Sequence, residues 1–273
     1  MPITISTLAQ TYAANRLNTS QDNLLGASEK LSSAKRINRA SDDAAGLAIA
    51  AQMATQLLGS QQAYRNSSDA ISYAQTAEGA LNEVGEITQR VRELSTQAAN
   101  GVLSDTDRAN IQTEISQLQE EAGRILGNSE FNGQSLFTGD NAVEFQVGDD
   151  AGETVALGDV DLQQQVTDSG FFNIDVSTQA GAAAALSSTD QTLDLVNQSR
   201  SDYGAFNNRM ESVGRSLQVE AENLAASKSR IMDADYAQQT ANRASSLILQ
   251  DAGLASIAQA NVSTGLVGYL LKQ

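Results

Sequence analysis

Few side chains in this sequence could carry out covalent chemistry. The 273 residues include no His, no Cys and no Trp, which excludes disulfides, zinc sites built from Cys or His, and nucleophiles activated by an imidazole. Residues 32–35 match the S-x-x-K pattern of acyl-transferring serine enzymes, with Ser32 as nucleophile and Lys35 as base, but the companion S-D-N and K-T-G motifs are missing. We therefore expect no catalytic residue, no cofactor and no enzyme activity.

A run of carboxylates at residues 149–153 is the one segment that suggests a cation site. Asp149, Asp150 and Glu153 flank Ala151 and Gly152. The alternating ligand spacing of an EF-hand is missing, so an acidic hairpin turn is favoured over a calcium site. We expect no bound metal.

A basic cluster is formed by Lys35, Arg36 and Arg39. It has too few charges, and no interleaved aromatic residues, for a nucleic-acid surface. We expect it to pair with acidic groups across a contact between subunits.

The overall charge points to a protein partner. The chain has 17 Lys and Arg against 33 Asp and Glu, a formal charge of −16, which repels a phosphate backbone and an anionic membrane surface. The sequence has no run of about 18 apolar residues, and its first residues have neither a basic n-region nor an apolar h-region. We expect no nucleic-acid partner, no membrane segment and no Sec-type signal peptide.

Helical periodicity organises most of the chain. The only proline is Pro2, so proline interrupts no helix beyond it. Apolar residues recur at heptad or near-heptad spacing, the pattern of coiled-coil seams, in three stretches: Ala77, Leu81, Val84, Ile87, Val91, Leu94 and Ala98; Ile111, Ile115, Leu118, Ala122 and Ile125; and Val196, Tyr203, Met210, Leu217, Leu224 and Ile231. Because aromatic residues make up only 4% of the chain, we expect a thin, long core.

The start and end of the first of these helices are marked by capping signals. Ser41 is expected to cap a helix whose first turn contains Asp42 and Asp43. The helix should end at Asn100 and Gly101 with a left-handed residue. A short turn then leads to Ser104 or Asp105, either of which could cap a third helix that should end near residues 127–128. Such a short turn implies antiparallel neighbours.

The middle of the chain has a different composition. Between Arg124 and Arg200 there is no Lys or Arg, but there are twelve acidic residues and five of the six Phe. Alternating apolar and polar residues with turn signals predict β-hairpins at 131–139, 143–147 and 154–157. We expect a short, acidic, β-rich outer segment at about 131–185.

The two ends carry apolar stripes that are too weak to fold alone. Residues 1–40 and 236–273 have apolar side chains at helical spacing, padded with Ala, Ser, Asn and Gln. Such helices must bury their stripes on each other or on neighbouring chains. We expect the polymerisation contacts to include Ile3, Ile5, Leu8, Leu254, Ile257 and Leu270.

Several long motifs, in order along the chain, resemble bacterial flagellin. They are LSSAKRINRASDDAAGLAIA at 31–50, QRVRELSTQAANG at 89–101, FNG at 131–133, SRIMDADYA at 229–237, LILQDAG at 247–253 and AQAN at 258–261. The resemblance covers roughly 1–135 and 190–273 and is far more specific than any single motif. The sequence has Ala34 where many flagellins have Gly, and Arg39 where many have Ser.

The resemblance implies a fold and a domain organisation. The fold is mainly α, an elongated antiparallel helical bundle with a small β-hairpin region and paired N- and C-termini. A terminal core domain (1–40 with 236–273) would drive polymerisation, and a rod-like helical domain (41–235) would contain the acidic segment. The large variable outer domains of longer flagellins are expected to be absent.

The resemblance also implies a function and a set of partners. The chain would be a structural subunit of the bacterial flagellar filament, which is exported and assembles outside the cell into a helical homopolymer for motility. Its partners would be the flagellar type III export apparatus, an export chaperone, the filament cap and the hook-junction proteins.

A host receptor is the last partner that the resemblance implies. Arg90, Leu94 and Glu114 match the surface recognised by the Toll-like flagellin receptor. Arg90 and Leu94 are four residues apart and so share a helix face, and Glu114 would join them from the antiparallel neighbour. The alternative is that Leu94 belongs to the helical seam.

Two other functions remain open at this point. A hook-filament junction protein would share the helical termini, although the QRVREL and SRIMDADYA segments favour flagellin. A cell-surface adhesin or glycan-binding module could use the acidic middle, where only three or four short strands are expected.

Overall fold

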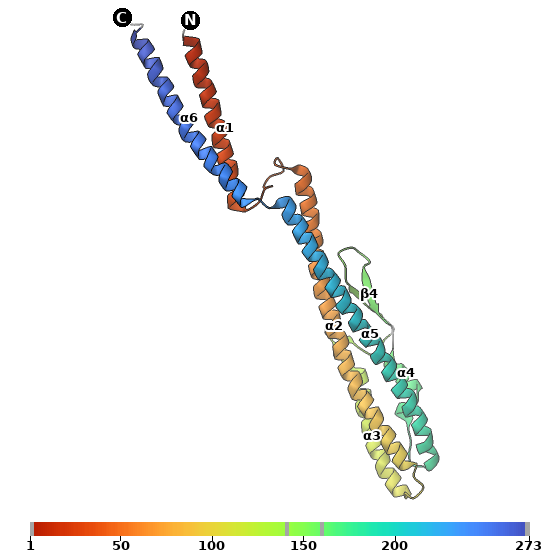
Figure 1. Ribbon diagram of the computed structural model, residues 1–273. Coiled ribbons are helices and arrows are strands. Elements are labelled where there is room, and N and C mark those ends of the chain that lie inside the picture. Colours follow the sequence, from red (N-terminus) through yellow and green to blue (C-terminus); the bar gives the residue numbers. More distant parts are fainter. Residues whose placement is uncertain (1–2, 140–141, 159–160, 271–273) are drawn as a thin grey trace. The chain divides into compact units, whose positions relative to one another are not determined.

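The computed structural model describes the backbone of residues 3–139, 142–158 and 161–270, and the side chains of those that lie between 11 and 262. Contacts divide the chain into a terminal unit, residues 1–57 with 223–273, and a central unit, residues 58–222. Both divisions fall inside long helices, α2 (Ala44–Ala98) and α5 (Gln179–Met232), at positions different from the expected boundaries at 40/41 and 235/236 (Figure 1). The two units are described separately.

The terminal unit pairs the two ends of the chain. Helices α1 (Ile3–Ser33) and α6 (Tyr236–Leu270) lie side by side (Figure 1, red and blue). Their contact uses small residues: the Ser20 hydroxyl donates a hydrogen bond of 2.8 Å to the Ser246 carbonyl, and Ala27 is buried. The predicted pairing of the termini is confirmed.

The central unit is built on α2, α5 and α3 (Asp105–Asn128). The first two seams lie in its core, with Leu81, Val84 and Ile115 fully buried. The third seam is buried from Val196 to Leu217, while Leu224 and Ile231, beyond the central unit, are partly exposed. The predicted helical class of the fold is therefore confirmed.

The ends of α2 differ from the sequence prediction. The helix begins at Ala44, and Asp43 caps it, because its Oδ1 accepts the Gly46 amide at 2.8 Å. Ser41 lies in the preceding turn, which closes where the Asp42 carboxylate accepts two backbone amides. Gly101 has no positive φ, so the predicted left-handed stop is also wrong.

Two short β-hairpins follow α3. Strand β1 (Glu130–Phe131) pairs with β2 (Gln134–Ser135), and Asn132 and Gly133 between them have φ of 52° and 78°, the conformation that a two-residue hairpin turn requires. Strand β3 (Val143–Gln146) pairs antiparallel with β4 (Thr154–Leu157). The predicted hairpins are confirmed in type, although the strands of the first end at Ser135 and not at residue 139.

Aromatic side chains attach both hairpins to the helices. The Tyr73 ring lies 5.7 Å from both Phe131 and Phe145, edge-on to each, and Phe145 lies 5.6 Å from Phe206 of α5. Edge-to-face pairs add a directional term to the burial of apolar area. The Phe-rich composition of the middle segment is therefore used to dock the hairpins on α2 and α5.

Helix α4 (Leu162–Asp168) and the 3-10 turn η1 (Phe171–Asn173) close the core beside α3. Phe171 is fully buried, and its carbonyl accepts a hydrogen bond from the Gln119 amide. Gln112 donates to the Ile174 carbonyl at 3.1 Å and accepts the Val176 amide at 2.7 Å. The irregular segment before α5 is thus held by side chains of α3.

Candidate assembly and recognition surfaces

The terminal unit exposes large apolar side chains along both of its long helices. We call this set the terminal apolar surface; it comprises Tyr12 and Leu25 of α1 and Tyr236, Leu247, Ile248, Leu249, Leu254 and Val262 of α6. So many large apolar side chains left exposed on two helices indicate a region of protein contact.

The small residues at the α1–α6 contact explain why so much apolar area remains outside. Within the described part of α1 and α6, the buried residues are Ser20, Ala27 and Ser246. These side chains bury little apolar area, so the pair gains little hydrophobic free energy from its own contact. The larger side chains are left for other partners.

The residues predicted for polymerisation lie partly on this surface. Leu254 is 51% exposed, and Ile257 is half-buried. Ile3, Ile5, Leu8 and Leu270 lie in helices whose side chains are not described at those positions. Their role stays a prediction.

Two members of the basic cluster, Arg36 and Arg39, have side-chain partners inside the terminal unit. Arg39 makes two hydrogen bonds of 3.1 Å to the Glu29 carboxylate, and Arg36 donates to the Ile231 carbonyl at 2.7 Å. The backbone of Lys35 pairs with Asp233. Arg36 and Arg39 therefore have partners within the chain, because the end of α5 lies beside the loop after α1. The pairing of the cluster across subunits stays a prediction.

The structure brings together two of the three residues predicted for receptor recognition. The Arg90 guanidinium donates to Glu114 at 2.8 Å and to Glu93 at 3.2 Å, and the hydrogen bond to Glu114 raises its pKa above the ordinary value, with a smaller contribution from Glu93. The side chains of Arg90 and Glu114 are 50% and 47% exposed. Leu94 is only 3% exposed and belongs to the helical seam.

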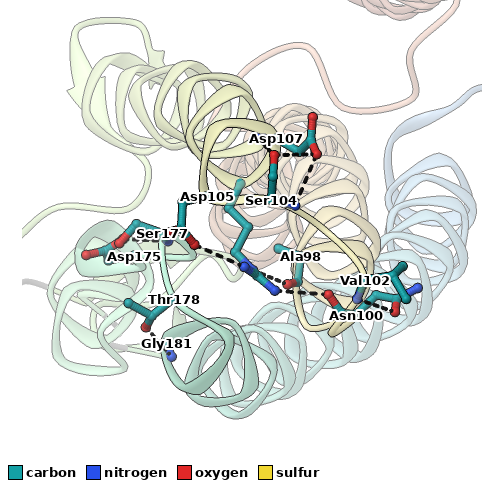
Figure 2. Close-up of polar contacts among 11 residues, drawn as sticks. Ala98, Asn100, Val102, Ser104, Asp105, Asp107, Asp175, Ser177, Thr178 and Gly181 are labelled. Carbon is teal, nitrogen blue, oxygen red and sulfur yellow. Dashed lines mark hydrogen bonds and ion pairs between the residues drawn. The ribbon is translucent and has the colours of Figure 1, made fainter.

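A polar cluster at the α2–α3 turn was not found from the sequence (Figure 2). The buried Arg108 donates through Nε to the Ala98 carbonyl and through Nη2 to the Asn100 carbonyl, both at 3.0 Å, and contacts Asp105 at 3.4 Å. The last carbonyls of a helix need such partners. Arg108 supplies them, so no left-handed residue is required at Gly101.

The same turn begins α3 with a capping box. The Ser104 hydroxyl accepts the Asp107 amide, and the Asp107 carboxylate accepts the Ser104 amide, an arrangement that satisfies two free amides reciprocally. Hydrogen bonds from the side chain and the backbone of Ser104 hold the pKa of Asp107 below its ordinary value. Of the two predicted caps, Ser104 and Asp105, the structure uses Ser104.

The remaining chemical motifs lie in structural roles. At the end of α1 the Lys35 amide donates to the Ser33 hydroxyl at 3.2 Å, as in a helix terminus. In the β3–β4 turn the Asp150 amide donates to the Glu153 carboxylate at 3.3 Å. Of the helices that the structure describes, none has the length and apolar character needed to span a bilayer.

Comparison with known families covers most of the chain. Residues 5–142 match the bacterial flagellin N-terminal helical region, and residues 186–270 match the bacterial flagellin C-terminal helical region. The chain belongs to the bacterial flagellin family.

Individual relatives agree with this assignment. A flagellar filament 30.7 kDa core protein of Treponema maltophilum is 37% identical, with 97% of this chain and 98% of the relative aligned. A flagellin of Halalkalibacterium halodurans is 41% identical over 90% of this chain and 91% of its own length. The crystal structure of Bacillus cereus flagellin matches with a TM-score of 0.52 and 30% identity, covering 60% of this chain and 94% of that one.

Family membership settles the general function. Flagellins are structural proteins, and this chain is a structural subunit of the extracellular flagellar filament, not an enzyme. The surfaces described above are therefore candidates for assembly and recognition rather than for catalysis.

Proposed function

We propose that the terminal unit is the polymerisation unit of this flagellin, and that the terminal apolar surface is covered by other copies of the chain. The exposure of Leu25, Ile248, Leu249 and Leu254 on two helices that bury little between themselves is the observation that carries this proposal. Because each such side chain is already partly buried, covering the rest of it gains about 1–2 kcal/mol. Several together offset the entropy cost of ordering the helices.

An open polymer requires contacts between unlike faces. The terminal apolar surface is made from two different helices, and we propose that its α1 part in one copy contacts its α6 part in the next. Heterologous contacts that do not close generate a helical filament. The ends of such a filament expose unsatisfied contacts, which we propose the cap and the hook-junction proteins cover.

Two leucines with equal exposure provide the test. Leu25, on the terminal apolar surface, and Leu58, at the edge of the central unit, are each 66% exposed. We expect Leu25→Ser to raise the critical concentration for seeded assembly by about tenfold or more, and Leu58→Ser to leave it nearly unchanged. Sedimentation of filaments at several protein concentrations measures this, and equal effects of the two variants would contradict the proposal.

Deletion of either end is the stronger form of the same test. We expect chains that lack residues 1–40 or 236–273 to remain soluble and helical but to give no sedimentable filaments. Normal filaments from either deletion would rule out the terminal unit as the polymerisation unit.

We further propose that the exposed α6 surface is held by an export chaperone before passage through the type III export apparatus. The proposal rests on the resemblance and on the apolar exposure of Leu254. Simultaneous polar substitution of Leu254, Ile257 and Leu270 should weaken chaperone binding at least tenfold by calorimetry. An unchanged affinity would contradict the assignment.

Arg90 and Glu114 are proposed to contact the Toll-like flagellin receptor of a host. Their exposed ion pair joins α2 and α3 on one surface, while the buried Leu94 supports that surface from below. We expect Arg90→Ala to weaken receptor binding more than tenfold, about 1.4 kcal/mol, without loss of helix. Arg124→Ala, which removes a similarly exposed ion pair with Glu121, is the matched control, and equal potency of wild type and Arg90→Ala would refute the proposal.

A further inference from the structure

A small junction inside the terminal unit joins the loop after α1 to the end of α5. The Arg36 amide donates to the Met232 carbonyl at 2.6 Å, and the Ala234 amide donates to the Ala34 carbonyl at 3.0 Å. Ile37, Ala50 and Met232 form its apolar cluster and are 1%, 2% and 9% exposed. The junction therefore depends on three buried side chains and a few backbone hydrogen bonds.

Methionine is the most readily oxidised residue type in this chain. The sequence has four Met and no Cys, His or Trp, so no thiol, imidazole or indole competes for a two-electron oxidant. Among the methionines whose side chains are described, Met53 is half-buried, Met210 is fully buried and Met232 retains 9% exposure. Met232 combines solvent access with membership of a core cluster.

We propose that Met232 is an oxidation site whose conversion to the sulfoxide opens this junction. With hydrogen peroxide, a lone pair of the thioether sulfur attacks one peroxide oxygen, the O–O bond breaks and an S–O bond forms. The sulfur is oxidised by two electrons, and the peroxide is reduced and leaves as water after proton transfer. Hypochlorite reacts in the same sense, with chloride as the leaving group.

The product cannot be accommodated where the thioether lies. A sulfoxide oxygen is a strong acceptor, and burying it without a donor is costly, yet its neighbours Ile37, Ala50, Leu47 and Ile231 are apolar. Ala34 at the edge of the junction has φ of 55°, a strained value for a residue with a Cβ. A cluster this small and already strained opens locally rather than absorbing the change.

The fully buried Met210 provides the internal contrast. It lies in the large core of the central unit, and its sulfur already receives a long contact of 3.9 Å from the Ser67 hydroxyl. Oxidant reaches it only when that core opens. Oxidation at low dose should therefore affect Met53 and Met232 and spare Met210.

The test uses the full-length chain, hydrogen peroxide as the oxidant and Met232→Leu as the resistant variant, since Leu has nearly the same volume. Sulfoxide is located by mass spectrometry of peptides, and opening is measured as hydrogen exchange of the Arg36 and Ala234 amides. We expect exchange in oxidised wild type to rise about tenfold or more and to return after methionine sulfoxide reductase treatment. Met232→Leu should stay protected, while Met53→Leu, the matched control, should respond like wild type.

Two results would overturn this inference: sulfoxide at Met232 with unchanged exchange, or equal opening in Met232→Leu. Loss of filament assembly on oxidation is a further expectation, which rests on the proposed role of the terminal unit. If the exchange results hold but oxidised protein assembles normally, that role fails and the oxidation site stands. If assembly is impaired in oxidised wild type but not in oxidised Met232→Leu, the result supports both the oxidation site and the role of the terminal unit.

Discussion

The two units of this flagellin differ first in charge. The central unit has eight Arg, no Lys and 26 Asp and Glu, a formal charge of −18, whereas the terminal unit has nine Lys and Arg against seven Asp and Glu, a formal charge of +2. Copies of the central unit repel one another in water, and copies of the terminal unit do not. On the proposed role of the terminal unit, attraction between subunits would come mainly from that unit, and added salt should favour assembly by screening the central one.

The units differ again in what they bury. The central unit encloses large side chains such as Phe137, Phe171 and Leu126, whereas the buried side chains described in the terminal unit are few and mostly small. A chain segment that buries little apolar area cannot offset its own ordering cost. The central unit has a large core of its own, whereas the terminal unit has one small cluster and, on its proposed role, would bury more apolar area by assembly.

A pair of leucine truncations tests this difference most strongly. Leu81→Ala, at a fully buried position of the central unit, should lower the free energy of unfolding by about 2–5 kcal/mol. Leu254→Ala, 51% exposed in the terminal unit, should change monomer stability by less than about 0.5 kcal/mol but weaken assembly. Urea unfolding followed by circular dichroism measures the first effect, and similar losses in both variants would remove the distinction between the units.

The next largest difference in stability is expected between two arginine substitutions, one in each unit. Arg108→Ala in the central unit removes a charged donor from the carbonyl of Ala98, at the end of α2, and from that of Asn100 in the following turn, which should cost about 1.5–3 kcal/mol. Arg39→Ala in the terminal unit removes an exposed pair with Glu29, which should cost at most about 1 kcal/mol. The same urea experiment ranks them, and an Arg39 effect as large as that of Arg108 would contradict the assignment of Arg108 as the main cap of α2.

The difference between these arginines also shows what the sequence could reveal. Helical seams were predictable because apolar periodicity reports directly which face is buried, as Val84 and Ile115 show. The role of Arg108 could not be predicted, because a side chain that caps another helix leaves no periodic signal in the sequence. Ser41 was a reasonable cap of α2 by residue type. The cap is Asp43 instead, because the turn closed by the Asp42 carboxylate includes Ser41 and delays the start of the helix.

The surface proposed for receptor recognition was predictable only in part. Motif resemblance placed Arg90 and Glu114 on neighbouring helices, and the structure brings them to 2.8 Å. Leu94 belongs both to the motif and to the seam, and sequence spacing could not decide between surface and core. The packing of α2 against its neighbours decides it, because Leu94 is 3% exposed.

Alkaline pH should affect the central unit through its buried tyrosine. Burial raises the pKa of Tyr203, with a smaller contribution from Tyr73, so its neutral form stabilises the fold at neutral pH, and this contribution is lost as the pH rises above the ordinary value of about 10. Tyr203→Phe should lose about 1 kcal/mol at pH 7, from its hydrogen bond to Leu136, yet depend less on pH between 10 and 12. Urea midpoints at several pH values measure this, and an unchanged slope for Tyr203→Phe would exclude Tyr203 as its source.

The smallest predicted effect lies in the terminal unit, at the residue where this sequence departs from many flagellins. Ala34 follows the last residue of α1 with φ of 55°, a helix-ending conformation that Gly adopts without strain and Ala does not. Ala34→Gly relieves that strain but increases the entropy of the unfolded chain, so we expect a net gain in stability of about 0.5–1 kcal/mol.

The control is Ala14→Gly, at an exposed position within α1, which should instead lower stability by about 1 kcal/mol. Hydrogen exchange of the Ala234 amide, which donates to the Ala34 carbonyl, measures the local change. Faster exchange in Ala34→Gly would mean that the left-handed residue is not strained, and that the junction owes its marginal stability to the Met232 cluster alone.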